Sequence, residues 1–346
     1  MRTWLHSRTA GASGTRFGRL ALALAAAGVV WAPAAHAAED LGAQRVATSM
    51  LTFLKIGVGA RAVALGEAFV PVADDATTLH WNPAGIADLA GPRAHVTHTS
   101  WPADISYDNF IYVQPTGAWG GGFGVQVSSL RTTLDYTTEA EPLPSGRTFG
   151  YSDLLIGGGY SRQFTDRFTL GVGLKYLRED LGSDVGGSVL HSWSMDMGTV
   201  FRLPYHSFRV SMAWTNFGPD FQPPGGYQSL GPNPADVRYA SFSPASIFAF
   251  GAAIEPIQQK HFRLLTAMQF DHPADGTELV KGGAELWVDE MVALRAGWNP
   301  HSDAMDFSTG IGFRGAVRSR VVHFDYAYTD GNALGRIDRF SVEVEF

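Results

Sequence analysis

The sequence predicts an all-β fold, a 14-stranded antiparallel transmembrane β-barrel with an N-terminal, partly helical hatch or plug segment. Three observations lead to this prediction. The chain starts with a secretory signal, hydrophobicity then alternates with period two, and the connections between the alternating stretches are short and long in turn. We expect a signal peptide at residues 1–37, a hatch inside the barrel at 38–91 and the barrel itself at 92–346.

The first segment has the three parts of a signal peptide. A basic region from Arg2 to Arg19 contains no acidic residue, an apolar run covers 20–30, and Ala35 and Ala37 are the small residues that signal peptidase reads. The alternative is a membrane anchor, but the apolar run is too short and a proline follows it. We therefore expect export through the Sec pathway and cleavage after Ala37.

Composition narrows the class of protein. The 346 residues include 40 glycines and no cysteine, so disulfides and cysteine-ligated metals are excluded. Removing residues 1–37 takes away four arginines and no acid, so the net charge moves from -7 to -11, which argues against nucleic acid as a partner. Beyond the signal, no apolar run approaches the ~20 residues of a spanning helix. If the chain crosses a membrane, it crosses as strands.

Residues 38–91 differ from the rest, because they are alanine-rich and lack period-two alternation. Short helix-like pieces are expected at 62–69, 75–79 and 83–89. Asp74 is a candidate helix N-cap, and Asn82 followed by Pro83 is typical of an N-cap and a first helical position. This segment precedes the first strand, so we expect it to begin on the periplasmic side.

From residue 92 onward the pattern is that of strands. At the C-terminal end, Phe340, Val342, Val344 and Phe346 alternate with polar or charged residues. We expect these four side chains to face lipid, and an arginine at Ser341, on the other face, to be milder than one at Val344. The fourteen expected strands are 93–101, 106–115, 119–130, 150–163, 166–178, 190–203, 208–217, 245–255, 261–271, 276–288, 291–298, 305–315, 319–329 and 338–346.

The connections between these strands alternate in length. Every second connection is short, whereas the others include all the long loops, as in outer-membrane barrels with short periplasmic turns and longer outer loops. A soluble β-sandwich has no reason to sort its loops in this way. The longest loop, 218–244, is rich in proline and glycine. We expect that it cannot pair as a strand and that it projects outward or folds over the mouth.

Sequence motifs that mark catalytic or cofactor-binding sites in other proteins are only weakly matched in this sequence. Residues 57–62, GVGARA, fit the dinucleotide-binding pattern, but an antiparallel meander follows instead of a βαβ unit. We read these glycines as places where backbone packs closely against a wall. There is no G-x-S-x-G motif, and the histidines are scattered; His323 and Asp325 share a strand face and could meet in the lumen. We expect no catalytic residues, no cofactor and no metal.

Charged residues fall on the polar faces of several expected strands. They could pair across the lumen and fill it, or they could line a solute path. These residues are Lys281, Glu285, Asp306, Arg314, Glu343 and Glu345.

Three stretches carry a resemblance to a known family. They are FLKIGVGARAVALGEAFV at 53–70, ADDA at 73–76 and HWNPAGIA at 80–87. Over about residues 52–90 they resemble the N-terminal signature of the PorV/PorQ family, which is similar to the FadL-type fourteen-stranded outer-membrane barrels. In FadL-type proteins a plug with an Asn-Pro-Ala segment lies inside the barrel, and Asn82, Pro83 and Ala84 fit that segment.

The resemblance implies two functions for a barrel in the outer membrane of a Gram-negative cell. FadL-type relatives pass hydrophobic small molecules, which is our leading expectation. PorV-type relatives are accessory or shuttle proteins for type IX secretion and surface attachment of exported proteins, which is the alternative. A barrel enzyme is a third possibility, and a Ser–His pair at the outer rim would favour it. The expected partners are outer-membrane lipid, the solute or exported protein, and the barrel-assembly machinery.

The candidate functional residues follow from these expectations. Phe346 is expected to be the signal that the assembly machinery reads. The hatch should carry the residues that pack against the wall or gate a path: Gly57, Gly59, Arg61, Asp74, Asp75, Trp81, Asn82 and Pro83.

Overall fold

A computed structural model describes residues 48–117, 120–138, 142–143, 146–228, 235–299, 306–331 and 335–346. The chain divides into two units, and all of these residues belong to the second, Gly42–Phe346. The expected signal peptide lies outside the described residues. No helix in the described ranges is long and apolar enough to cross a membrane.

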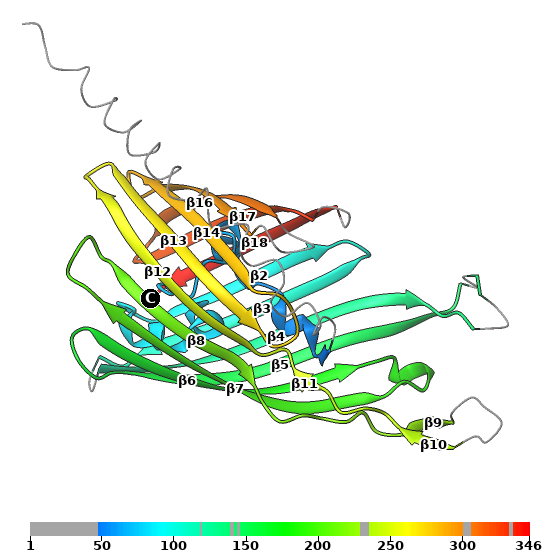
Figure 1. Cartoon of the computed structure of the whole chain (residues 1–346). Helices are drawn as coiled ribbons and strands as arrows, with labels where there is room; N and C mark the ends of the chain where they lie inside the picture. Colours follow the sequence, from blue (N-terminus) through cyan, green and yellow to red (C-terminus); the bar gives the residue numbers. More distant parts are fainter. Residues whose placement is uncertain are drawn as a thin grey trace, which may run out of the picture. The chain divides into compact units, whose positions relative to one another are not determined.

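Within the described residues, fourteen strands form a closed antiparallel barrel (Figure 1). Each strand pairs with its sequence neighbours, and β18 pairs with β2 to close the ring. This confirms the predicted fold class. The strands are β2 (Arg93–Trp101), β3 (Ile105–Pro115), β4 (Gly121–Asp135), β5 (Thr148–Gln163), β6 (Phe168–Asp180), β7 (Val189–Arg202), β8 (Arg209–Phe217), β12 (Ile247–Gln258), β13 (Phe262–Pro273), β14 (Leu279–Val288), β15 (Val292–Trp298), β16 (Phe307–Val317), β17 (Arg320–Asp330) and β18 (Arg336–Glu345).

The two ends of the barrel differ as the sequence predicted. One end, called here the short-turn end, has connections no longer than 203–208, and the other, the long-loop end, has connections up to 218–246. Side chains alternate between a buried inner face and an exposed outer face along each strand. The outer face is largely apolar; Phe340, for example, is 54% exposed there, and Phe346 is 53% exposed. Such an apolar outer band is the surface that a transmembrane barrel presents to lipid.

The longest loop corrects one expectation. Within 218–246, β9 (Gly226–Gln228) pairs with β10 (Asp236–Arg238), and β11 (Ser243–Pro244) pairs with β1 (Ser49–Met50). Pairing is possible because the residues of β9 and β10 contain no proline, so each can form ladder hydrogen bonds. The prediction that this loop cannot pair was therefore wrong. Figure 1 shows β9 and β10 extending away from the long-loop end.

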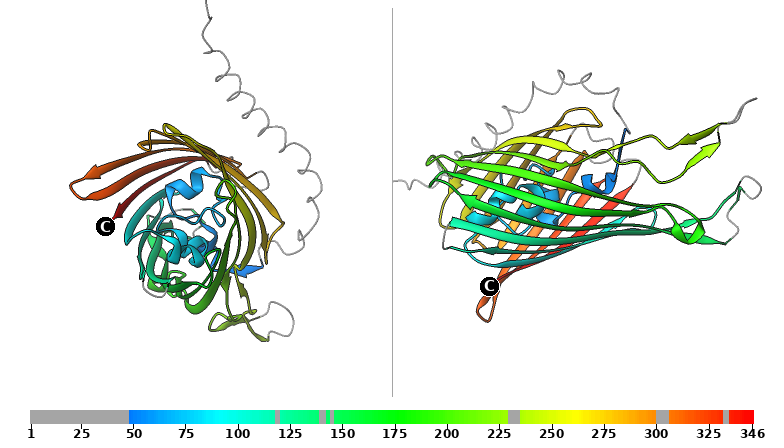
Figure 2. Two further views of the ribbon diagram at one scale, coloured as in Figure 1. Left: turned by 90° about the vertical axis from the view of Figure 1, so that its left-hand side faces the viewer. Right: turned by 90° about the horizontal axis from the view of Figure 1, so that it is seen from below.

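Residues 48–91, called here the inner segment, lie within the ring of strands (Figure 2). The segment starts at the long-loop end, where β1 pairs with β11, and it reaches the short-turn end at Arg93. Our expectation that it begins on the periplasmic side was therefore wrong for its described residues. Its elements are η2 (Thr52–Lys55), α2 (Ala60–Ala64), α3 (Thr78–Trp81) and η3 (Pro83–Asp88). A further 3-10 turn, η5 (Ser183–Val185), lies between β6 and β7.

Local chemistry sets the ends of these helices. Helix α2 stops at Ala64 instead of continuing to 69, because Gly66 and Glu67 adopt left-handed backbone angles, with φ of 65° and 62°. Asn82 is the N-cap of η3, and its side chain accepts a hydrogen bond from Ala84 N, with Pro83 at the first position, as predicted. Asp74 does not cap a helix; the N-cap of α3 is Thr77.

Candidate functional site

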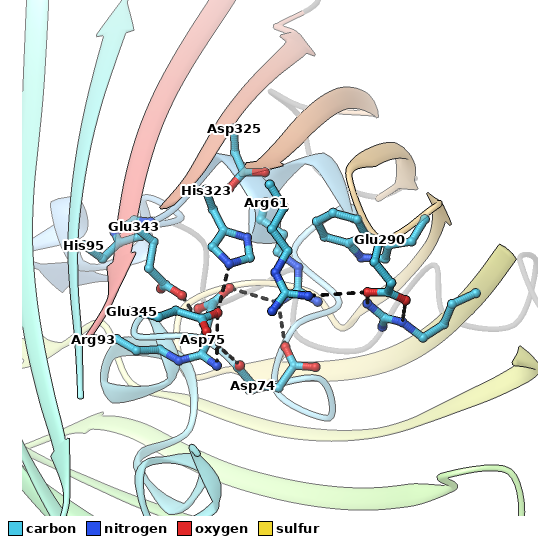
Figure 3. Close-up of a pocket in the computed structure, with 13 residues that line it drawn as sticks. Arg61, Asp74, Asp75, Arg93, His95, Glu290, His323, Asp325, Glu343 and Glu345 are labelled. Carbon is cyan, nitrogen blue, oxygen red and sulfur yellow. Dashed lines mark hydrogen bonds and ion pairs between the residues drawn. The ribbon is translucent and has the colours of Figure 1, made fainter. Parts of the chain in front are cut away.

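An ion-pair network joins the inner segment to the barrel wall, beside the polar cavity that is drawn in Figure 3. Arg61, in α2, donates two hydrogen bonds to Glu285 of β14, each 2.8 Å long. The same guanidinium contacts Asp74 at 2.5 Å and Asp75 at 3.1 Å. Glu285 is fully buried and also accepts from Arg295 Nε at 2.6 Å. Three of the residues predicted from the sequence, Arg61, Asp74 and Asp75, are thus brought together.

The network keeps its groups charged. Burial alone would lower the pKa of Arg61, but Asp74, Glu285 and Asp75 outweigh it and raise that pKa well above its usual value. Burial would raise the pKa of Asp74, but Arg61 and Arg209 outweigh it and hold that pKa below its usual value. A buried charge network of this kind is stable only when its members are paired, so it pins the inner segment in place.

A polar cavity of about 180 Å³ opens beside this network, towards the short-turn end. Four arginines, six carboxylates, two histidines and Trp287 line it. His323 and Asp325 both face the cavity but do not pair with each other; His323 contacts Glu345 at 2.9 Å, and Asp325 contacts Arg295 at 2.6 Å. The charges predicted for the lumen therefore mostly pair and fill it at this level.

One cluster on the cavity wall has metal-ligand chemistry. His323, Glu343 and Glu345 each offer a ligand atom, and these atoms lie within 4.8 Å of one another. However, Arg93 contacts Glu343 at 2.9 Å and Glu345 at 3.4 Å. Because a guanidinium already neutralises these carboxylates, we assign the cluster to the ion-pair network.

An aromatic and cationic stack separates this cavity from a second, smaller one of about 40 Å³. Arg61, which lines the first cavity, lies over the ring of Phe69 at 5.4 Å from its centroid. Phe69 in turn packs edge-on against Trp81, which lines the second cavity, with centroids 6.3 Å apart. Trp81 Nε1 donates to Val58 O at 2.9 Å. The stack of Arg61, Phe69 and Trp81 therefore links the lining of one cavity to the lining of the other.

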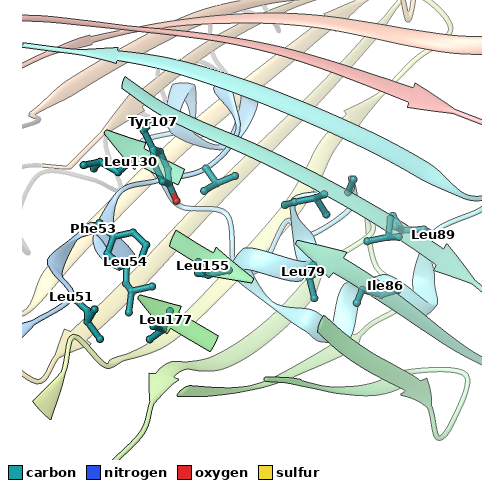
Figure 4. Packing of buried hydrophobic residues seen from close by; sticks show 14 residues of the cluster. Leu51, Phe53, Leu54, Leu79, Ile86, Leu89, Tyr107, Leu130, Leu155 and Leu177 are labelled. Carbon is teal, nitrogen blue, oxygen red and sulfur yellow. The ribbon is translucent and has the colours of Figure 1, made fainter. Parts of the chain in front are cut away.

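The inner segment also fills an apolar site at the long-loop end (Figure 4). Leu51, Phe53 and Leu54 are at most 4% exposed. They belong to one cluster with wall residues from β3, β4, β5 and β6, namely Tyr107, Leu130, Leu155 and Leu177. Leu51 holds a left-handed φ of 58°, which is unusual for a leucine and costs about 1 kcal/mol or more. The chain itself thus occupies the apolar site with a strained turn.

The Asn82-Pro83 segment docks on β6 and β7, beside the wall that carries the apolar cluster. The Asn82 side chain is completely buried and donates to Val70 O at 3.1 Å and Thr199 O at 3.2 Å. Wall glycines allow this approach: a Cβ at Gly171 would lie 2.3 Å from Ala84 N, and one at Gly198 would lie 2.0 Å from Asn82 Oδ1. Any larger residue at either position would collide with the inner segment.

The other predicted residues have different surroundings. A Cβ at Gly57 would meet Glu67 of the inner segment, whereas one at Gly59 would lie 2.9 Å from Thr77 of the inner segment and 3.7 Å from His95 of the β2 wall. Phe346 lies at the short-turn end, where Arg320 stacks on its ring and its backbone N donates to Pro92 O at 2.9 Å, next to the last residue of the inner segment. Sequence reasoning missed Phe69, Arg209 and Arg295, and the wall glycines. The sequence indicated them only weakly: the arginines and wall glycines occupy inward-facing positions of strands, and Phe69 lies within the stretch 53–70 that carries the family resemblance.

Sequence comparison covers only part of the chain. The model of an uncharacterised protein family, UPF0164, matches residues 26–168. A UPF0164 protein of Treponema pallidum (strain Nichols) is 29% identical over 85 residues, which are 25% of this chain and 22% of that protein. The match therefore spans about a fifth of the length of the relative.

Solved structures with a similar fold include a hydrocarbon channel, a toluene transporter and a FadL homologue. The CymD monoaromatic hydrocarbon channel has a TM-score of 0.57 at 13% identity, covering 84% of this chain and 98% of that one. The Ralstonia pickettii toluene transporter TbuX has 0.53 at 11% identity, covering 83% and 97%. A Pseudomonas aeruginosa FadL homologue has 0.51 at 13% identity, covering 82% and 96%. The chain thus has a FadL-like barrel fold.

Proposed function

We propose that this protein passes hydrophobic small molecules across the outer membrane, as a FadL-like barrel of the PorV/PorQ type. One observation carries the proposal. The apolar site at the long-loop end is formed by wall side chains, and the strained turn Leu51–Leu54 occupies it. A site with apolar walls and a displaceable apolar occupant is suited to an apolar solute. The channels named above, for monoaromatic hydrocarbons and toluene, support this solute class.

Passage then requires two steps in this proposal. The solute first takes the place of Leu51, Phe53 and Leu54 among the wall residues. It then has to pass the stack of Arg61, Phe69 and Trp81 and the ion pairs of Arg61, which together are called here the floor of the lumen. The first step replaces the apolar contacts of these three side chains, whereas the second breaks the ion pairs of Arg61. We therefore assign the gate to the Arg61 network and the binding site to the apolar cluster.

The experiment alters the occupant of the apolar site. The double variant Phe53→Ala, Leu54→Ala removes two apolar side chains from that site without touching the floor. Binding of toluene to the purified barrel, followed by quenching of tryptophan fluorescence or by calorimetry, should become tighter by about tenfold, because less of the occupant must be displaced. Leu294→Ala is the control, since Leu294 lies on the outer face and is 50% exposed. Absence of toluene binding in both wild type and double variant would contradict the proposal.

An accessory role in type IX-like protein secretion and surface attachment is the second candidate. It is favoured by the dense ion pairs of the floor and by the small volume of the two lumen cavities, about 180 and 40 Å³. The long-loop end also extends outward in β9 and β10. Deleting the gene and measuring the surface proteome separates the two functions. Loss of attached surface proteins with unchanged toluene uptake would favour the accessory role.

Localisation and assembly belong to the same proposal. We infer that the chain is exported and inserted in the outer membrane, with Phe346 as the residue that the assembly machinery reads. Membrane fractionation and N-terminal sequencing test the first point, and a start near Ala38 is expected. Phe346→Ser should lower the amount of assembled barrel in the outer membrane. Recovery of the wild-type protein in the soluble periplasm would exclude this localisation.

A further inference from the structure

Three polar side chains on the outer wall form a hydrogen-bonded chain. His98 and Ser100 lie two residues apart on β2 and so share its outer face, and Asp108 is the cross-strand partner of His98 on β3. Ser100 Oγ lies 3.2 Å from His98 Nε2, and His98 Nδ1 lies 2.7 Å from Asp108 Oδ1. The order hydroxyl, Nε2, Nδ1, carboxylate is that of a serine-hydrolase triad.

We propose that Ser100, His98 and Asp108 are the catalytic residues of an esterase that acts on lipids at the long-loop end of the barrel. This activity is separate from passage through the lumen, because the three side chains are exposed on the outside of the wall. It also departs from our expectation of no catalytic residues, which rested on the scattered positions of the histidines. The pairing was not visible in the sequence because Asp108 comes from the neighbouring strand.

This arrangement distinguishes His98 from the other histidines. Among the described residues, His98 alone hydrogen-bonds to a hydroxyl through one ring nitrogen and to a carboxylate through the other. His261 pairs with Asp289, and His323 pairs with Glu345, but no serine or threonine occupies the second nitrogen of either ring. An ion pair with Asp108 alone would leave the second ring nitrogen of His98 unused, whereas here Ser100 Oγ lies 3.2 Å from it.

The surroundings indicate the substrate class. Ser100 is the second-last residue of β2, so the triad lies near the long-loop end of the wall. The same outer face carries Phe340 at the level of His98, and Val96 and Phe110 one step towards the short-turn end; these side chains are 54%, 52% and 44% exposed. Phe340 is the cross-strand partner of His98. An ester at the boundary between lipid headgroups and acyl chains would have its carbonyl at Ser100 and its acyl chain on these apolar side chains.

The chemistry requires only these residues, the ester and water. Asp108 accepts a hydrogen bond from Nδ1–H of His98 and so leaves Nε2 free of a proton. Nε2 then takes the proton of Ser100 as Oγ bonds to the ester carbonyl carbon. The ester C–O bond then breaks, and His98 returns the proton to the leaving alcohol. Water attacks the acyl-serine in the same way and releases a carboxylic acid. Arg131 is the partner of Ser106 on β4, two strands from Ser100, and its Nε donates to Ser129 Oγ at 3.1 Å, so it adds positive charge to this part of the outer face.

Covalent labelling tests the nucleophile. The full-length barrel in detergent micelles is treated with diisopropyl fluorophosphate, and the modified residue is identified by mass spectrometry. A single adduct on Ser100 is expected, and it should be lost in Ser100→Ala and in His98→Gln. Ser106→Ala is the matched control, because Ser106 is the cross-strand partner of Ser100 and hydrogen-bonds to no histidine. No adduct on the wild type, or an adduct unaffected by His98→Gln, would overturn the proposal.

Hydrolysis tests the substrate class. Wild type should release fatty acid from phosphatidylethanolamine in mixed micelles and should prefer p-nitrophenyl palmitate over p-nitrophenyl acetate. Ser100→Ala should lower kcat/KM at least about a thousandfold, and Asp108→Asn should lower it less. His261→Ala should leave it unchanged, and heat-dependent gel mobility confirms that each variant is folded. Equal hydrolysis by wild type and Ser100→Ala would exclude the triad, and a preference for the acetate ester would exclude lipid as the substrate.

Discussion

Arg61 of the inner segment and Glu285 of β14 form a two-bond ion pair, with Nε–Oε2 and Nη2–Oε1 distances of 2.8 Å. Glu285 also forms an ion pair with Arg295, and Arg295 forms a second ion pair with Asp325 of β17. Both partners of the first pair are shielded from solvent, with Glu285 fully buried. The inner segment is therefore held by a charge network that runs along the wall from β14 to β17.

Replacing Glu285 should strongly destabilise the barrel. Glu285→Gln removes the negative charge between two buried arginines, Arg61 and Arg295, and buried charges that lose their partner cost about 3–5 kcal/mol. The measurement is urea unfolding in detergent, followed by tryptophan fluorescence. Glu290→Gln is the control, because Glu290 pairs with Arg263 but is 45% exposed, and an exposed pair contributes about 0–1 kcal/mol. Equal losses for the two variants would show that burial of Glu285 does not matter.

Shortening Arg61 should open the lumen. Arg61→Ala removes the guanidinium that lies over Phe69 and leaves Asp74 and Asp75 without this partner. Joining the two cavities should raise the ion conductance of single barrels in planar bilayers several-fold. Arg263→Ala is the matched control, since Arg263 lines the same cavity but contacts Glu290 at the short-turn end. If both variants conduct like the wild type, the stack does not close the path.

Wall glycines should be needed for docking of the inner segment. A Cβ at Gly171 would lie 2.3 Å from backbone atoms of Pro83 and Ala84, and backbone cannot move aside as a flexible side chain can. Gly171→Ala should therefore cost about 1–3 kcal/mol or more in unfolding free energy. Gly150→Ala, where a Cβ would meet nothing within 4 Å, should cost less than about 0.5 kcal/mol. Similar stability of the two variants would contradict the packing described here.

Period-two alternation predicted the barrel because it depends only on which side chains face lipid. The strand Arg93–Trp101 was predicted with its observed ends, and the other strand ends differ by a few residues. Alternation cannot show what fills the inside. Arginine at Ser341, read as a lumen residue, was expected to be milder than arginine at Val344, but Ser341 is buried and accepts a hydrogen bond from Ala60 N. We now expect Ser341→Arg to be as damaging as Val344→Arg, since it would push the inner segment off the wall.

Only the part of the candidate site that lies within one segment of the sequence could be predicted. Arg61, Asp74 and Asp75 were named from a motif that lies within one short segment. Their partner Glu285 was named only as a lumen charge, because more than 200 residues separate it from Arg61. Ser100, His98 and Asp108 were missed altogether. Which residue faces which across strands depends on register, and register is set by turns whose lengths the sequence shows only approximately.

The last prediction concerns acid and the inner segment. His80 of α3 is 7% exposed, and its Nδ1 lies 3.2 Å from Gln126 Nε2, so the neutral ring can accept that hydrogen bond. Burial, and then the positive charge of Lys175, lowers the pKa of His80 from 6.5 to about 3. The folded protein therefore binds fewer protons than the unfolded chain between pH 6.5 and about 3. By linkage, the contribution of His80 to stability is complete above pH 6.5 and is lost as the pH falls through this window.

The magnitude can be measured with one variant. At pH 5 the loss due to His80 should be about 2 kcal/mol relative to pH 7.5, from 1.36 kcal/mol per pKa unit. His80→Gln removes the titrating group, so its unfolding free energy should fall less between these pH values by about that amount. His261→Gln is the control, because His261 is exposed at the short-turn end. If all three proteins lose stability with the same slope, the buried imidazole is not the group through which acid loosens the inner segment.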